Sequence, residues 1–225
     1  MELKTSISEK KRAIGITWGS VSGFQPFRDL GAIPYESTLE RDFVIRAAHN
    51  PDVVSVESQP FTIQYENKDG FLRSYTPDYK VTYRDRTGDF RKNEIFEVKP
   101  ERKLKEQLHE WKPKYLAAIN YCKYNDFVFK LIHEHKIRDQ RWENAMQFSR
   151  VRGIEYSQDN YEKVIVQLRQ DQISTVDELA ENCFSKEWIN WGKSLICALI
   201  DQCEIYYDAN HPFTTSSKIW APAND

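Results

Sequence analysis

The segment 75–100 constrains the fold of this chain more than any other part of it. It reads YTPDYKV, then a turn at residues 86–89 that contains a glycine, and then IFEVKP. Two strand-like runs on either side of such a turn predict an antiparallel hairpin. Because the first strand of a hairpin starts opposite the end of the second, we expect Asp78 to lie close to Glu97 and Lys99.

The side chains that this hairpin brings together predict a chemistry. Strand residues two apart share a face, so Glu97 and Lys99 should emerge together while Val98 points into the core. Two carboxylates can hold Mg²⁺, the metal lowers the pKa of a bound water, and a lysine can stabilise charge on a phosphate. A solvated hairpin with scattered charges fits the pattern at least as well. The neighbouring helices, and Pro77 and Pro100 beside both ends of the motif, favour a site for phosphodiester hydrolysis.

The charge of the chain is unevenly distributed. Its 225 residues allow one large domain or two small ones. Residues 1–150 carry 26 Lys and Arg against 22 Asp and Glu, whereas residues 151–225 carry 6 against 12. We therefore expect nucleic-acid contact in the first domain and protein contact in the second. No apolar run suits a signal peptide or a membrane span, so we expect a soluble, cytoplasmic protein.

Periodicity in residues 1–150 predicts an α/β domain with a mixed sheet flanked by helices. Residues 1–34 should form an irregular, solvated arm, with DNA contact as the alternative. Pro113 should kink or divide the second helix. The helices and strands are expected at 37–47, 53–56, 61–66, the two hairpin strands, 101–123 and 127–132.

The remaining residues predict a small helical module. Helices are expected at 161–168, 176–182 and 186–202. The segments 205–207 and 218–220 should pair as a short β-wing. This order of elements suggests a winged-helix module over 151–225. The four cysteines show no CxxC spacing, so we expect reduced thiols rather than zinc ligands or disulfides.

Four segments in order resemble the N-terminal nuclease domain of the TnsA family, the endonuclease subunits of heteromeric transposases. The resemblance runs over roughly residues 30–135 and implies a restriction-endonuclease-like PD-(D/E)xK fold. Residues 151–225 resemble, less specifically, the winged-helix domain at the C-terminus of that family. The four segments are ESTLERDF (36–43), NPDVVSVESQPF (50–61), YTPDYKV (75–81) and FEVKP (96–100).

The resemblance also implies the site residues. The helix carboxylate of the family falls on Glu40, its strand aspartate on Asp78, and its acidic-or-amide position on Glu97. Its lysine falls on Lys99. The implied cofactor is Mg²⁺, two ions per site with Mn²⁺ as a substitute. The implied metal ligands are Asp78, Glu40, Glu97 and the backbone carbonyl of Val98; some family members have Gln at the position of Glu97.

The helix ligand has an alternative. Glu40 stands three residues after Ser37, a spacing typical of helix capping, and Glu36 could hold the metal instead. We favour Glu40 because it continues the helix face of Val44 and Ala47, which should pack on the sheet.

Other chemically suggestive residues have simpler interpretations. We place Glu57 and Gln59 beside the site rather than in it. Lys103 could touch phosphate, but a solvated helix residue is the simpler interpretation. The same holds for His133-Glu134-His135 as a solvent-facing strand end rather than a metal site, and for Trp188 and Trp191 as packing residues rather than a partner anchor.

The resemblance implies a function and partners. It indicates a Mg²⁺-dependent DNA endonuclease that cleaves the non-transferred strand at the 5′ ends of a transposon. The implied partners are double-stranded transposon-end DNA, a DDE-type (TnsB-like) transposase subunit and an AAA+ (TnsC-like) ATPase regulator. A stand-alone restriction-like or repair nuclease is the alternative, and a catalytically silent scaffold is a third interpretation that the intact site residues disfavour.

Overall fold

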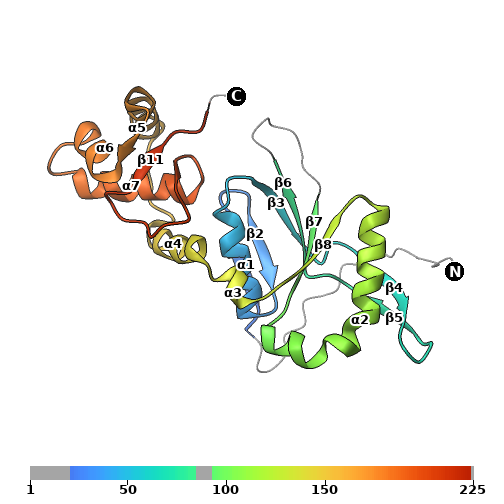
Figure 1. Cartoon of the computed structure of the whole chain (residues 1–225). Coiled ribbons are helices and arrows are strands. Elements are labelled where there is room, and N and C mark those ends of the chain that lie inside the picture. The colour runs from blue at the N-terminus through green and yellow to red at the C-terminus, as the bar shows by residue number, and fades with distance from the viewer. Residues whose placement is uncertain (1–20, 85–92, 224–225) are drawn as a thin grey trace. The chain divides into compact units, whose positions relative to one another are not determined.

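A computed structural model describes residues 21–84 and 93–223 of the chain. It divides the protein into two compact units (Figure 1). Unit 1 comprises the residues up to Ala47 together with Asp52–Ile137, and unit 2 comprises Ala48–Pro51 together with the residues from Arg138 onward. Unit 2 thus begins earlier in the sequence than residue 151, where the change in charge suggested a boundary.

Unit 1 is built on a four-stranded mixed sheet with the order β3-β6-β7-β8. The pairs β3·β6 and β6·β7 are antiparallel, and β7·β8 is parallel. The register places Tyr79 opposite Phe96, which confirms the predicted pairing; the turn at 86–89 lies outside the described residues. The strands are β3 (Val53–Ser58), β6 (Tyr79–Tyr83), β7 (Glu94–Val98) and β8 (Val128–Ile132).

Two helices cover opposite faces of this sheet (Figure 1). Helix α1 (Thr38–Ala48) packs through Phe43, whose ring contacts Tyr79 and Phe96. Helix α2 (Glu101–Tyr124) packs through Tyr115 against Phe129 of β8. Since side chains alternate along a strand, Phe96 and Val98 face α1 whereas Glu97 faces α2.

Helix α2 runs through Pro113 without ending. Proline lacks the N–H that a helix interior uses, so the sequence predicted a kink or a division there. The division did not occur, and Figure 1 shows α2 changing direction along its length. The second half of α2 therefore returns over the sheet and brings Lys114 and Tyr115 toward β7.

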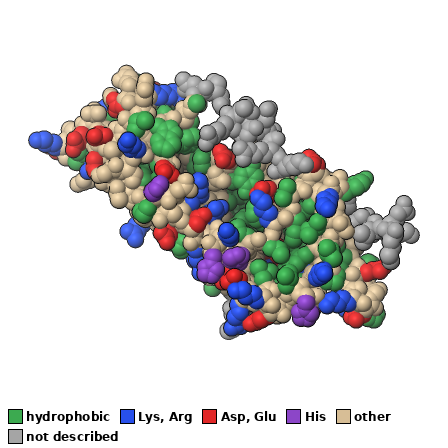
Figure 2. Space-filling model, viewed as in Figure 1, with side chains coloured by type: hydrophobic (Ala, Val, Ile, Leu, Met, Phe, Trp, Pro, Cys, Tyr) green, Lys and Arg blue, Asp and Glu red, His purple; other side chains and the backbone are tan. Residues whose placement is uncertain are grey.

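Two further hairpins belong to unit 1. β1 (Gly23–Pro26) pairs with β2 (Ala32–Tyr35), so the expectation of an irregular arm up to residue 34 is wrong for the described part. β4 (Ile63–Glu66) pairs with β5 (Leu72–Tyr75), which separates β5 from the β6·β7 hairpin. Exposed apolar side chains occur on α2 and β8, and Figure 2 shows hydrophobic side chains among Lys and Arg in this region. Unit 1 ends with the short helix α3 (Glu134–Ile137).

Unit 2 packs its helices around a buried core that includes Leu168, Leu179, Leu195 and Leu199. The capping box between Thr175 and Glu178, predicted from their spacing, is present. Two short helical elements before α5 were not anticipated. The elements of the unit are α4 (Gln140–Phe148), the 3₁₀ helix η1 (Ser149–Val151), α5 (Gln158–Asp171), β9 (Ser174–Thr175), α6 (Val176–Cys183), α7 (Ile189–Asp201), β10 (Tyr206–Tyr207) and β11 (Lys218–Trp220).

The three short strands of unit 2 form one antiparallel sheet with the order β10-β11-β9. The pairing of β10 with β11 is the one that the sequence predicted. All four cysteines are free, with Cys122 and Cys183 buried and the other two half-buried. No helix in the described ranges is long and apolar enough to cross a membrane.

Candidate active site

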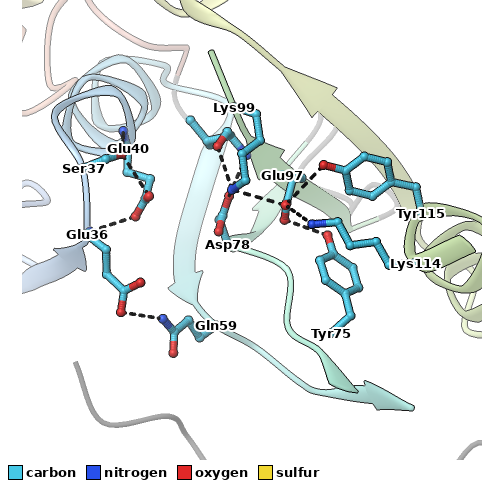
Figure 3. Close-up of polar contacts among 11 residues, drawn as sticks. Glu36, Ser37, Glu40, Gln59, Tyr75, Asp78, Glu97, Lys99, Lys114 and Tyr115 are labelled. Atoms are coloured by element: carbon cyan, nitrogen blue, oxygen red, sulfur yellow. Dashed lines mark hydrogen bonds and ion pairs between the residues drawn. The ribbon is translucent and has the colours of Figure 1, made fainter. Parts of the chain in front are cut away.

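The Lys99 ammonium group lies at the centre of the candidate site (Figure 3). Its Nζ donates to Asp78 Oδ2 at 3.1 Å and to the carbonyl oxygen of Val98 at 3.1 Å. It also lies 3.2 Å from Glu97 Oε1. The antiparallel register explains this meeting, because Asp78 directly precedes β6 while Val98 ends β7. The predicted convergence of Asp78, Glu97 and Lys99 is confirmed.

The surroundings of Asp78 disfavour the ionised form of its carboxylate. Its Oδ2 also accepts a hydrogen bond of 2.7 Å from the backbone N–H of Val98. The pKa of Asp78 is raised to about 7, first by burial and then by the negative charge of Glu97, against the opposing effect of Lys99. The ionised carboxylate is therefore costly here and would gain from an additional cation.

Glu97 is buried rather than presented at the sheet edge. Only 2% of the residue is exposed, and its carboxylate faces α2. Tyr75 donates to Oε2 at 2.7 Å. On the other oxygen, Oε1, Lys114 Nζ and the Tyr115 hydroxyl each lie at 3.5 Å, in addition to Lys99. The expected outward-facing pair of Glu97 and Lys99 is thus wrong for Glu97, because the returning half of α2 covers it.

The two lysines of the site differ in their electrostatics. Burial alone would lower the pKa of Lys99, but Asp78 and Glu97 outweigh burial and the pKa lies above its ordinary value. Burial lowers the pKa of Lys114, and Glu97 opposes this only in part. Lys99 therefore stays protonated and is a poor general base.

A cavity of about 330 Å³ opens beside Asp78. Its carboxylates come from three places: α1 and the segment just before it, strand β3, and the residue that precedes β6. The lining residues are Ile33, Pro34, Glu36, Glu40, Val56, Glu57, Ser58, Gln59, Asp78 and Tyr79. Glu97 and Lys99 lie outside this lining, and Figure 3 shows Glu97 on the side of Asp78 away from Glu36 and Glu40.

Both candidate helix carboxylates line the cavity. Glu40 accepts hydrogen bonds from the backbone N–H of Glu36 at 2.8 Å and from Ser37 Oγ at 2.9 Å, so it does perform the capping role. Burial raises the pKa of Glu40, while these two hydrogen bonds lower it. Glu36 accepts a hydrogen bond from Gln59 at 3.2 Å. Because both carboxylates line the cavity, the assignment of Glu40 rather than Glu36 as the metal ligand stays a prediction.

The other candidates lie away from this centre or have structural partners. Lys103 is exposed on α2. Glu134 accepts from the backbone N–H of Glu101 at 2.9 Å and so caps α2. Trp188 of unit 2 is 59% exposed, whereas Trp191 is half-buried.

The chemistry of the donors fits a divalent cation. Asp78 Oδ2, Glu97 Oε1 and the Val98 carbonyl oxygen all lie within 3.1–3.2 Å of one positive charge, the Lys99 ammonium group. The resemblance implies these same three groups as metal ligands. No three His, Cys, Asp or Glu side chains in residues 21–84 and 93–223 are arranged to hold a metal. Mg²⁺ is commonly bound through only one or two carboxylates and water, so the donor set still suits it.

Sequence reasoning missed Tyr75, Lys114 and Tyr115. Tyr75 stands directly before the Thr-Pro-Asp run and was treated as part of the strand motif only. Lys114 and Tyr115 follow Pro113, where a break in the helix was expected. A polar residue beside an aromatic one on the sheet-facing side of a helix was the signal available.

Comparison with known families bears on the same residues. Residues 50–134 match the family model described as TnsA-like endonuclease N terminal, which confirms the resemblance over this segment. The match contains Asp78, Glu97 and Lys99, whereas Glu36 and Glu40 precede it. It implies a nuclease. No curated protein matches the chain.

Proposed function

From the TnsA-like endonuclease domain over residues 50–134, we propose that this protein is a Mg²⁺-dependent DNA endonuclease. The observation that carries the proposal is the convergence of Asp78, Glu97 and the Val98 carbonyl on the Lys99 ammonium group, beside a carboxylate-lined cavity. Metal ligation would fall to Asp78 and Glu40, with Glu97 and the Val98 carbonyl as further oxygen donors. When bound, Mg²⁺ supplies a water of lowered pKa and stabilises charge on the phosphate.

The residues of the chain have separate tasks in this proposal. Asp78 places negative charge where the cavity meets the end of β7, and the nearby charges of Glu97 and Glu40 add to the attraction for a cation there. Lys99 stays protonated because Asp78 and Glu97 raise its pKa. Its three N–H groups face Asp78, Glu97 and the Val98 carbonyl, so it acts on the phosphate through its positive charge and does not remove a proton.

The fold assignment is part of the proposal. A mixed sheet with α1 on one face and α2 on the other supports a restriction-endonuclease-like PD-(D/E)xK architecture for unit 1. Helices α5–α7 and the sheet β10-β11-β9 support a winged-helix-like assignment for unit 2. We assign partner docking to unit 2, because it carries 14 Asp and Glu against 9 Lys and Arg, and this net negative charge disfavours binding to the phosphates of DNA.

The biological reaction that we propose is cut-and-paste transposition. The chain would cleave the non-transferred strand at the 5′ ends of an element, with a DDE-type transposase acting on the 3′ ends and an AAA+ ATPase linking the complex to its target. The TnsA-like match supports this proposal.

Mapping of cut positions tests the proposal. Duplex DNA carrying a transposon end is incubated with the full chain and Mg²⁺, with and without a DDE-type transposase and an AAA+ ATPase. Cuts confined to the 5′ side of the end and dependent on the partners support the transposon role. Sequence-specific cutting of the same DNA by the chain alone would support the stand-alone nuclease instead.

A further inference from the structure

Glu97 is held from both of its oxygens by donors that come from different elements. Tyr75 at the end of β5 donates to Oε2 at 2.7 Å. Oε1 faces Lys99 at 3.2 Å, and Lys114 and Tyr115 of α2 each at 3.5 Å. A carboxylate that is 2% exposed requires such donors, because burying an unpaired charge is very costly.

The two carboxylate oxygens of Glu97 have different hydrogen-bond donors, and this difference sets the orientation of the carboxylate. Tyr75 occupies Oε2, so the other oxygen is turned toward the two ammonium groups. Burial and the charge of Glu97 raise the pKa of the Tyr75 hydroxyl well above its ordinary value, so it remains a donor. The hydrogen bond from Tyr75 therefore fixes which way the carboxylate is turned.

Lys114 is itself held in place by three aromatic rings. Its Nζ lies 4.6 Å from the centroid of Trp111, 4.8 Å from that of Tyr115 and 5.1 Å from that of Tyr75. Rings at these distances attract an ammonium group and restrict its movement. Trp111 and Tyr115 are also in edge-on contact with each other.

We propose that Tyr75, Lys114 and Tyr115 are positioning residues of the nuclease site, and that they act through Glu97 on the Lys99 ammonium group. The inference rests on the proposed function and deepens it. Lys99 contacts three oxygens, and Glu97 Oε1 is the one whose position these residues control. Mutation of a group that orients an active-site residue without touching the substrate typically lowers activity by about 10- to 100-fold.

The first test examines the metal-free protein and needs no cleavage. Lysine labelled with ¹³C at Cε is incorporated into the full chain, and the resonances of Lys99 and Lys114 are assigned by substitution. Tyr75→Phe should move both resonances. Tyr121→Phe, a matched change on α2 away from Glu97, should move neither. Unmoved Lys99 and Lys114 signals in Tyr75→Phe would overturn the proposal.

The second test measures the rate of DNA cleavage at saturating DNA. Tyr75→Phe should lower this rate by about 10- to 100-fold and leave the DNA affinity within about twofold of wild type. A tyrosine with only a structural role would change the melting temperature without this selective loss of rate. A rate in Tyr75→Phe equal to that of Tyr121→Phe would overturn the proposal.

A double-mutant cycle tests whether Tyr75 acts through Glu97. In the Glu97→Ala background, Tyr75→Phe should change the remaining rate by less than about twofold, because its partner is gone. Persistence of the full loss in that background would overturn the proposal. If Glu97→Ala does not fold, Glu97→Gln serves as the background, and there the effect of Tyr75→Phe should shrink at least threefold. A wild-type protein that never cuts DNA would instead remove the proposed function, while the resonance test still reports on the contacts.

Discussion

Replacing Asp78 with asparagine should make the metal-free protein more stable at alkaline pH while removing its activity. The side chain of Asp78 is only 20% exposed and lies close enough to Glu97 and Glu40 to be repelled by both. Asparagine keeps the shape and can still accept the hydrogen bond from the Val98 N–H. It cannot ionise, so it removes the cost of the buried charge.

The magnitude follows from the raised pKa. The carboxyl titrates at about 7 in the folded protein against 3.8 ordinarily. Between these values the folded state holds a proton that the unfolded state has lost, so stability falls as the pH rises and levels off above 7. The difference sets a ceiling of about 4 kcal/mol. Since the amide also leaves Lys99 with one carboxylate fewer, we expect a gain of about 1–3 kcal/mol at pH 8 and less than about 0.5 kcal/mol at pH 4.

Differential scanning calorimetry without divalent metal measures this effect. The melting temperature of unit 1 should rise by about 2–10 °C at pH 8 in Asp78→Asn. Asp69→Asn is the matched control, because Asp69 lies in the exposed turn between β4 and β5. It should leave the melting temperature unchanged at both pH 4 and pH 8. A lower melting temperature in Asp78→Asn at pH 8, or an equal shift at both pH values, would refute the reasoning.

Three further predictions follow. Lys99→Ala should eliminate cleavage but retain Mn²⁺ binding, measured by calorimetric titration, because the ammonium group holds no metal; loss of both together would show that the assigned roles are wrong. Gly192→Ala should destabilise unit 2 by about 1–3 kcal/mol in thermal unfolding, because the new Cβ would lie 2.2 Å from the Phe184 ring; unchanged unfolding would mean that the ring can move away. Trp188→Ala, at an exposed aromatic residue of unit 2, should weaken capture of the transposase or the ATPase in a pull-down without changing DNA retention; undiminished capture of both would remove Trp188 from the docking surface.

The sequence predicted the parts of the site that depend on local pattern. Alternation in β6 and β7 and a turn between them were enough to bring Asp78 near Lys99, because register follows from strand pairing. The burial of Glu97 could not be obtained this way. It depends on α2 continuing past Pro113, so that Lys114 and Tyr115 reach Glu97 of β7; this tertiary contact overrides the local preference of proline to break a helix.

The same distinction applies elsewhere in the chain. The capping box at Thr175 was predictable because three residues determine it. The β1·β2 hairpin was missed because its strands are four residues each and the glycines nearby suggested an irregular segment. The cavity beside Asp78 joins residues from α1, β3 and β6, and no spacing in the sequence encodes that meeting.

Metal-dependent DNA cleavage by the purified chain tests the central claim most directly. Supercoiled plasmid or transposon-end duplex is incubated with Mg²⁺ or Mn²⁺, with the transposase and ATPase added in parallel reactions, and nicks are counted over time. Wild type and Asp69→Ala should cut at the same rate, chelation should stop both, and Asp78→Ala should lose at least 100-fold while remaining folded, because several kcal/mol of metal assistance are removed. Cutting by Asp78→Ala at close to the wild-type rate would contradict the account.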